Sequence, residues 1–138
     1  MTDEAKQWVA VTVLVFRGDR LLAMQRSSHA EAAPGLWEAI SGRVRAGEDP
    51  HAAAQRELAE ESGLAIDVGA LPVDAYAASR NGEPMVVLVY VGRSMEGEVA
   101  LSDEHDAYRW CTLAEFKALG APPRLAKAAA LAWPEPTA

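Results

Sequence analysis

Three glutamates, Glu57, Glu60 and Glu61, form the densest acidic group of the sequence. In a helix, residues three and four apart share one face, so these side chains would point in the same direction. Grouped carboxylate oxygens are the ligands that Mg²⁺ and Mn²⁺ prefer, and a bound cation would relieve the repulsion between them. The group could therefore hold a divalent cation. Taken alone, an acidic segment is more often a solvated helix face.

The residues around this group predict a helix with defined ends. Asp49 suits the N-cap, and Pro50 suits the first helical position, where its missing N–H costs nothing. Residues 52–61 favour helix, and Gly63 is a natural stop in the left-handed conformation. The carboxylates would then emerge at the edge of the buried stripe of a bounded helix.

The rest of the chain alternates between apolar runs and turn residues. The runs at 8–16 and 85–91 are almost wholly apolar, which is typical of strands covered on both faces. Shorter strands are expected at 21–25, 36–40, 64–68, 73–78 and 107–112, and two further helices at 113–119 and from 124 to about 132. We therefore predict an α/β fold, specifically an α/β/α sandwich with a mixed central sheet.

Length and charge narrow the function classes. At 138 residues, the chain is expected to form a single domain over 1–138. Its 13 basic and 20 acidic side chains give a net charge of -7, which argues against a nucleic-acid polymer or an anionic membrane as a partner. A small anionic substrate stays possible, because bound Mg²⁺ inverts the sign of a carboxylate-lined site. The single cysteine, Cys111, is expected to be a buried strand residue.

The N-terminal residues lack the basic start and apolar core of a signal peptide. No apolar run approaches the roughly 20 residues that span a bilayer. We therefore expect a cytoplasmic protein, either a monomer or a homodimer.

The acidic group belongs to a longer pattern of fixed spacing. Gly42, five residues, Glu48, seven residues, Arg56-Glu57-Leu58, one residue, Glu60-Glu61, one residue and Gly63-Leu64 resemble the Nudix hydrolase signature at each position. The box 42–64 is the diagnostic part. Arg26, Trp37 and the segment 104–110 also fall in family order. Many members enter the box with Pro-Gly-Gly, whereas this chain has Ile40-Ser41-Gly42, which is similar to some triphosphate-cleaving members, including those acting on a pterin triphosphate.

The resemblance implies the Nudix fold and roles for individual residues. Glu57 and Glu61 would be the leading metal ligands, completed by Glu60 and by the backbone carbonyl of Ser41, which precedes the box glycine Gly42. The expected cofactor is Mg²⁺, with Mn²⁺ as a possible substitute.

Further residues would support the reaction. Arg56 would orient the glutamates and pair with Glu48. Arg26 matches a family arginine that contacts substrate phosphate. Glu104 matches a downstream glutamate that can bind a further metal or act as general base, and a box glutamate such as Glu60 is the other candidate for that base.

The function implied is hydrolysis of the diphosphate linkage in a small nucleoside diphosphate derivative. The leading hypothesis is a nucleoside (or pterin) triphosphate pyrophosphohydrolase. A dinucleotide or nucleotide-sugar hydrolase is the alternative, although residues 79–82 lack the proline or tyrosine that some of those classes carry. A third hypothesis, from another class, is a nucleotide-binding regulatory domain without catalysis; such domains typically lose box glutamates, which this chain retains.

Other residues carry weaker signals. His29, His51 and His105 are scattered, and we predict no metal site from them, although His105 follows Glu104 directly. Trp8, Trp37, Tyr108 and Trp110 could stack a base, but such residues are more often core.

Overall fold

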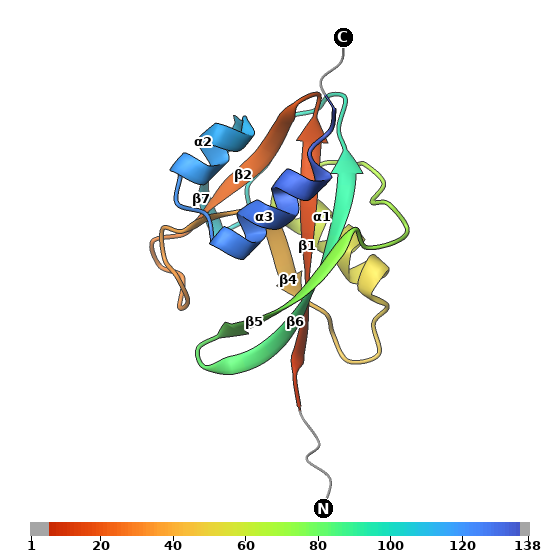
Figure 1. The fold of residues 1–138 in the computed structure, drawn as a ribbon, viewed down its shortest axis with the longest axis vertical. Coiled ribbons are helices and arrows are strands. Elements are labelled where there is room, and N and C mark those ends of the chain that lie inside the picture. The colour runs from red at the N-terminus through yellow and green to blue at the C-terminus, as the bar shows by residue number, and fades with distance from the viewer. Residues whose placement is uncertain (1–5, 136–138) are drawn as a thin grey trace, which may run out of the picture.

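The computed structural model describes residues 6–135 and contains one mixed seven-stranded sheet with three helices (Figure 1). The strand order is β3-β2-β1-β6-β5, with β4 paired to β1 and β7 paired to β2. In chain order the elements are β1 (Trp8–Arg17), β2 (Arg20–Arg26), β3 (Trp37–Glu38), β4 (Ile40–Arg43), α1 (Pro50–Ser62), β5 (Asp74–Arg80), β6 (Glu83–Arg93), β7 (His105–Cys111), α2 (Leu113–Ala118) and α3 (Pro123–Ala132).

Strand β1 lies at the centre of the sheet. Its side chains are buried from Ala10 to Phe16, as predicted for a strand covered on both faces. One edge pairs in parallel with β6, and the other pairs antiparallel with β4 and, through the hairpin after Arg17, with β2. The sheet is therefore mixed.

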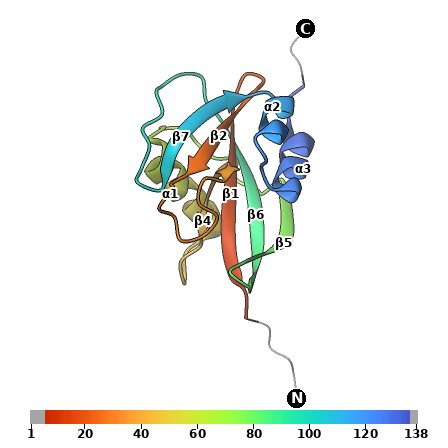
Figure 2. The same ribbon diagram turned by 90° about the vertical axis from the view of Figure 1, so that its left-hand side faces the viewer.

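Helices cover both faces of this sheet (Figure 2). On one face, Ala54 and Leu58 of α1 pack with Val13 and other alternate β1 residues. On the opposite face, Phe116 of α2 and Leu125 of α3 join a separate cluster with the remaining β1 side chains. The predicted α/β/α sandwich is confirmed.

Helix α1 begins and ends where the sequence predicts. The Asp49 side chain accepts a hydrogen bond from the His51 backbone N–H at 2.9 Å, and Pro50 is the first helical residue. Gly63 ends the helix in the left-handed conformation with φ 69°, and its N–H donates to the Ala59 carbonyl. These ends fix which side chains face the sheet.

Two expected strands differ from the prediction. Residues 64–68 form no strand; only Val68 makes a bridge, to Gly92. The Gln55 side chain of α1 explains this, because its amide donates to the Ile66 carbonyl at 2.6 Å and accepts from the Val68 N–H at 3.0 Å. The run 36–40 is divided into β3 and the start of β4.

The other elements agree closely with expectation. The Asn-Gly turn joins β5 to β6 with positive φ at both Asn81 and Gly82, as a type I′ hairpin requires. Cys111 is fully buried, as predicted. Among the described residues, no helix is long and apolar enough to cross a membrane.

Candidate active site

Three carboxylates converge where α1 faces the loop before β7. Oxygen atoms of Glu57, Glu61 and Glu104 all lie within 4.8 Å of one another. Glu57 and Glu61 are buried, with 8% and 2% of their surface exposed, whereas Glu104 is exposed to solvent. Glu57 and Glu61 come from successive turns of α1, which is why their spacing of four residues places them together.

Burial makes these carboxylates unusual acids. Desolvation raises the pKa of Glu61 far above its ordinary value, and the nearby Glu57 charge raises it further. Burial also raises the pKa of Glu57, although the Arg56 guanidinium opposes this shift. The pair therefore resists carrying two negative charges unless a cation joins it.

Arg56 contacts both Glu48 and Glu57. Its Nε and Nη2 donate to the two carboxylate oxygens of Glu48, each at 2.9 Å, and its Nη1 donates to Glu57 Oε1 at 2.7 Å. The hydrogen bond from Arg56 lowers the pKa of Glu48 to about 2. This forked geometry fixes the guanidinium and thereby the direction of the Glu57 carboxylate.

Gly42 of β4 allows the helix carboxylate to approach the sheet. A Cβ atom at this position would overlap the Glu57 carboxylate, so any other residue would displace it. The preceding residue, Ser41, lies opposite Thr12 of β1, with its Oγ 3.5 Å from Glu38 Oε1. The use of its carbonyl as a metal ligand stays a prediction.

Glu60 lies apart from the converging carboxylates. Its side chain is 52% exposed, and its Oε2 is 3.4 Å from Arg56 Nη1. Its other oxygen is 4.0 Å from Arg45 Nη2. Glu60 thus borders the site on its solvent side, and its roles as ligand and base stay predictions.

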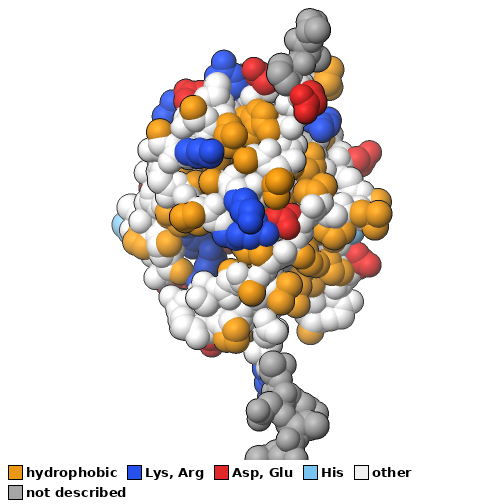
Figure 3. Space-filling model, viewed as in Figure 1, with side chains coloured by type: hydrophobic (Ala, Val, Ile, Leu, Met, Phe, Trp, Pro, Cys, Tyr) orange, Lys and Arg blue, Asp and Glu red, His pale blue; other side chains and the backbone are white. Residues whose placement is uncertain are grey.

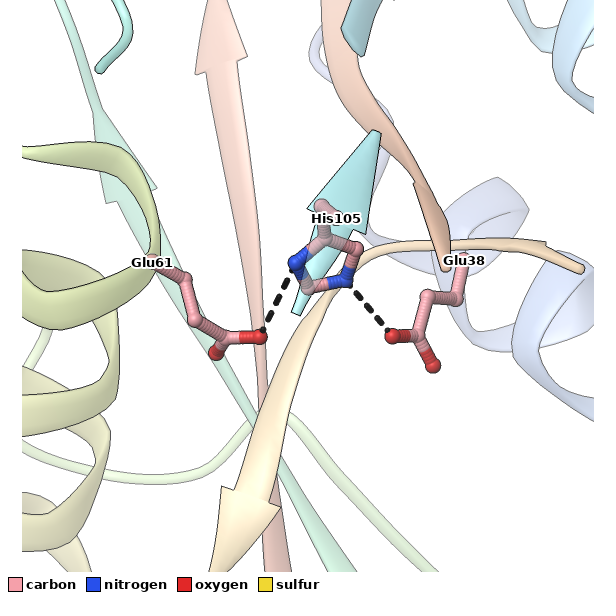
Figure 4. Close-up of side chains that lie close together, drawn as sticks. All are labelled: Glu38, Glu61 and His105. Atoms are coloured by element: carbon pink, nitrogen blue, oxygen red, sulfur yellow. Dashed lines mark hydrogen bonds and ion pairs between the residues drawn. The ribbon is translucent and has the colours of Figure 1, made fainter. Parts of the chain in front are cut away.

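A second buried group, formed by Glu38, His105 and Glu61, adjoins the first (Figure 4). His105 Nε2 is 2.9 Å from Glu38 Oε2, and its Nδ1 is 3.6 Å from Glu61 Oε1. His105, which the sequence marked only by its place beside Glu104, therefore lies in a cluster with two glutamates rather than with the other histidines. Two features of the sequence could have indicated these residues as part of the site. His105 follows Glu104 at the start of a strand, and Glu38 is a lone charge within an apolar run.

Arg26 reaches this second group rather than the three converging carboxylates. Its Nη1 is 3.3 Å from Glu38 Oε2, and its Nε donates to the Ala32 carbonyl at 2.8 Å. Two of its five N–H groups are used in these contacts, and the predicted contact with substrate phosphate stays a prediction.

A cavity of about 520 Å³ opens on the opposite face of the sheet, beside α3. Figure 3 shows this face, over which hydrophobic side chains are spread and basic and acidic side chains touch near the centre. The lining residues are Ala10, Thr12, Ala32, Ala33, Leu36, Glu38, Ala39, Ser41, Gly42, Arg43, Tyr76, Ala77, Ala78, Ser79, Arg80, Asn81, Met85, Val87, Pro122, Arg124 and Leu125. Glu38, Ser41 and Gly42 thus connect the cavity to the carboxylates.

The aromatic residue of this cavity is Tyr76, which the sequence did not single out. Arg124 lies over its ring at 4.4 Å and pairs with Asp74 at 2.9 Å. None of Trp8, Trp37, Tyr108 and Trp110 lines the cavity. Along β5, half-buried residues, Tyr76 among them, alternate with exposed ones.

The carboxylate group fits a hard divalent cation. Its donors are all carboxylate oxygens, which such cations prefer. Glu61 Oε2 is buried and has no hydrogen-bond partner among the described residues. A cation there would satisfy this oxygen and offset the charge that burial disfavours.

Comparisons with known proteins indicate the family to which the chain belongs. A family model described as the NUDIX domain matches residues 6–132. The CTP pyrophosphohydrolase of Escherichia coli is 30% identical over 106 residues, covering 74% of this chain and 73% of that protein. An octanoyltransferase of Myxococcus xanthus is 34% identical over 110 residues, which cover 74% of this chain but only 29% of that longer protein.

Solved structures agree on the fold. The MutT protein from Methanosarcina mazei Go1 superposes with a TM-score of 0.80 at 24% identity, covering 92% of this chain and 93% of that one. The family model extends over nearly all the described residues, and the signature 42–64 lies within it. The resemblance drawn from the sequence is confirmed, and the chain belongs to the Nudix hydrolase family.

Proposed function

We propose that this protein is a Mg²⁺-dependent pyrophosphohydrolase of nucleoside triphosphates or of a pterin triphosphate, with Mn²⁺ able to replace Mg²⁺. The observation that carries the proposal is that a carboxylate group and a cavity lie next to one another. The convergent carboxylates Glu57, Glu61 and Glu104 suit a cation, and the cavity that begins at Ser41 and Gly42 suits the group attached to the phosphates.

The residues divide between holding the cation and supporting the reaction. Glu57 and Glu61 would hold it, with Glu60 and the Ser41 carbonyl as further ligands. When bound, the cation would neutralise phosphate charge and polarise water for attack on phosphorus. Arg56, held by Glu48, keeps Glu57 aimed at the site, and Gly42 leaves room for that carboxylate.

Proton transfer and phosphate binding fall to other side chains. Glu104 is exposed to solvent and close to Glu57 and Glu61, which supports its role as the base that removes a proton from the attacking water. Arg26 retains N–H donors beyond its contacts with Glu38 and Ala32, and these would contact a phosphate oxygen.

The cavity supports a single nucleoside-sized group. Its volume of about 520 Å³ is within the range of small-molecule sites, and its lining is largely apolar with a few charged residues. Tyr76 offers a ring for stacking, and Arg124 is fixed over it by Asp74. The name of the Escherichia coli relative, a CTP pyrophosphohydrolase, also favours a triphosphate.

A hydrolysis screen tests the proposal. The protein is incubated with nucleoside triphosphates, a pterin triphosphate, dinucleotides and nucleotide sugars, with Mg²⁺ or with EDTA, and the products are separated by chromatography. We expect a triphosphate to give a monophosphate and pyrophosphate only with Mg²⁺. Faster cleavage of dinucleotides or nucleotide sugars would favour the alternative enzyme, and nucleotide binding without turnover would favour a regulatory domain.

Location and assembly also stay proposals. We propose a cytoplasmic protein that is a monomer or homodimer, with a small-molecule substrate rather than a nucleic-acid polymer or a membrane as its partner. Light scattering on the purified protein would measure the molar mass and decide between the two assemblies.

A further inference from the structure

His105 is a buried imidazole at a junction between strands. It is the first residue of β7 and lies opposite Arg26 of β2, where a register shift between Gln25 and Arg26 interrupts the ladder. Such irregularities redirect side chains next to active sites. Only 1% of the His105 side chain is exposed, and both ring nitrogens face carboxylates (Figure 4).

The Nε2 side of the ring connects to the phosphate-binding candidate. Nε2 lies 2.9 Å from Glu38 Oε2, and the same oxygen lies 3.3 Å from Arg26 Nη1. Glu38 also lines the cavity. A single carboxylate oxygen therefore joins His105 to Arg26 and to the cavity wall.

The Nδ1 side faces a proposed metal ligand. Nδ1 lies 3.6 Å from Glu61 Oε1, which is longer than a hydrogen bond, and Nδ1 has no hydrogen-bond partner among the described residues. A rotation of the Glu61 side chain that brings Oε1 within hydrogen-bond distance of Nδ1 would close this gap. Oε1 would then be held by His105, and Oε2, which also lacks a partner, would be left for a cation.

We propose that His105 is a positioning residue that fixes the Glu61 carboxylate for the cation and, through Glu38, ties it to Arg26 and the cavity. This inference rests on the proposed function. The four side chains Arg26, Glu38, His105 and Glu61 come from β2, β3, β7 and α1, so they join elements that are distant in the sequence. A purely structural histidine would support the fold without affecting the affinity for the metal.

Two substitutions separate the two sides of the ring. In His105→Asn the amide lies near the position of Nδ1, and in His105→Gln it reaches the position of Nε2. The proposal predicts that His105→Gln keeps the contact with Glu38 but weakens Mn²⁺ binding about tenfold, as expected when a residue behind a ligand is lost. His105→Asn keeps the side that faces Glu61 but loses the contact with Glu38, so it should weaken Mn²⁺ binding less than His105→Gln does.

The measurement is a titration of the metal-free protein with Mn²⁺ followed by electron paramagnetic resonance, with thermal unfolding to check the fold. His51→Gln is the matched control, because His51 is a half-buried histidine outside the carboxylate clusters, and its Nε2 lies 2.9 Å from the Val68 backbone oxygen. It should bind Mn²⁺ as the wild type does. Equal Mn²⁺ affinity in folded His105→Gln, His105→Asn and wild-type protein would overturn the proposal.

A double-mutant cycle tests the link to Glu38. If Glu38 acts through His105, the losses of Mn²⁺ affinity in Glu38→Gln and His105→Gln will not add in the double variant, whereas independent roles would give additive losses and contradict the link. These measurements use Mn²⁺ alone. Failure of the hydrolysis screen would remove the proposed function, whereas an unaltered Mn²⁺ affinity in the variants would remove only the role of His105.

Discussion

The two faces of the sheet are built in different ways. On the α1 face, Arg56, Glu57 and Glu61 come from a single helix, and Glu104 joins them from a distant loop. On the α3 face, the cavity is assembled from segments spread between Ala10 and Leu125. The difference suggests that the reaction is encoded locally, in one spaced motif, and that the choice of substrate depends on the tertiary structure.

The largest loss of activity should come from substitutions on the α1 face. Glu57→Gln and Glu61→Gln should each leave the fold intact and reduce Mg²⁺-dependent kcat by about 1,000-fold, since cation charge stabilisation contributes several kcal/mol. Steady-state kinetics against increasing Mg²⁺ measures this. Glu98→Gln, an exposed glutamate distant from the box in sequence, serves as the control. Wild-type turnover in either site variant would remove the metal assignment.

The second largest effect on kcat should separate proton transfer from metal binding. Glu104→Gln should lower kcat by about 100-fold, as loss of a general base does, while Mn²⁺ still binds. The comparison of kcat with Mn²⁺ affinity in the same variant provides the test. An unchanged kcat would transfer the role of base to a box glutamate such as Glu60.

Substitutions in the cavity should change KM more than kcat. Tyr76→Leu removes the ring on which a base would stack and should raise KM by about tenfold with a smaller change in kcat, since stacking contributes about 1–3 kcal/mol. Tyr108→Leu is the control, because Tyr108 is 39% exposed and does not line the cavity. If Tyr76→Leu lowered kcat and left KM unchanged, the division of labour between the two faces would be wrong.

The smallest effect should be on stability and should come from the ion pair between Glu48 and Arg56. The folded-state pKa of Glu48 is about 2, below its ordinary value of 4.5, so the charged residue stabilises the fold above pH 4.5. This contribution should disappear as the pH falls through 2. Urea unfolding across this range should therefore show a stability difference between wild type and Glu48→Gln that shrinks in acid. A difference independent of pH would contradict the pairing with Arg56.

The sequence predicted those features that depend on short-range spacing. Asp49, Pro50 and Gly63 defined α1, and the intervals from Gly42 to Leu64 were sufficient to indicate the family. The mixed sheet also followed from its apolar runs. Residues 64–68 were wrongly expected to be a strand because the Gln55 side chain, rather than a neighbouring strand, satisfies the backbone there.

The parts that sequence could not predict depend on contacts between distant elements. Glu38 and His105 are 67 residues apart, and their contact depends on how β2 pairs with β3 and β7. Tyr76 and Arg124 meet only because α3 crosses the sheet beside β5. Neither contact follows from the spacing of residues within one helix or strand, which is what a sequence pattern shows.

The most direct test of the central claim is to locate the cation itself. Crystals of the protein soaked in Mn²⁺ would be measured for anomalous scattering near the manganese absorption edge. The account predicts an anomalous peak between Glu57, Glu61 and Glu104, and its loss in crystals of Glu61→Gln. A strong peak elsewhere, with none among these three carboxylates, would contradict the account.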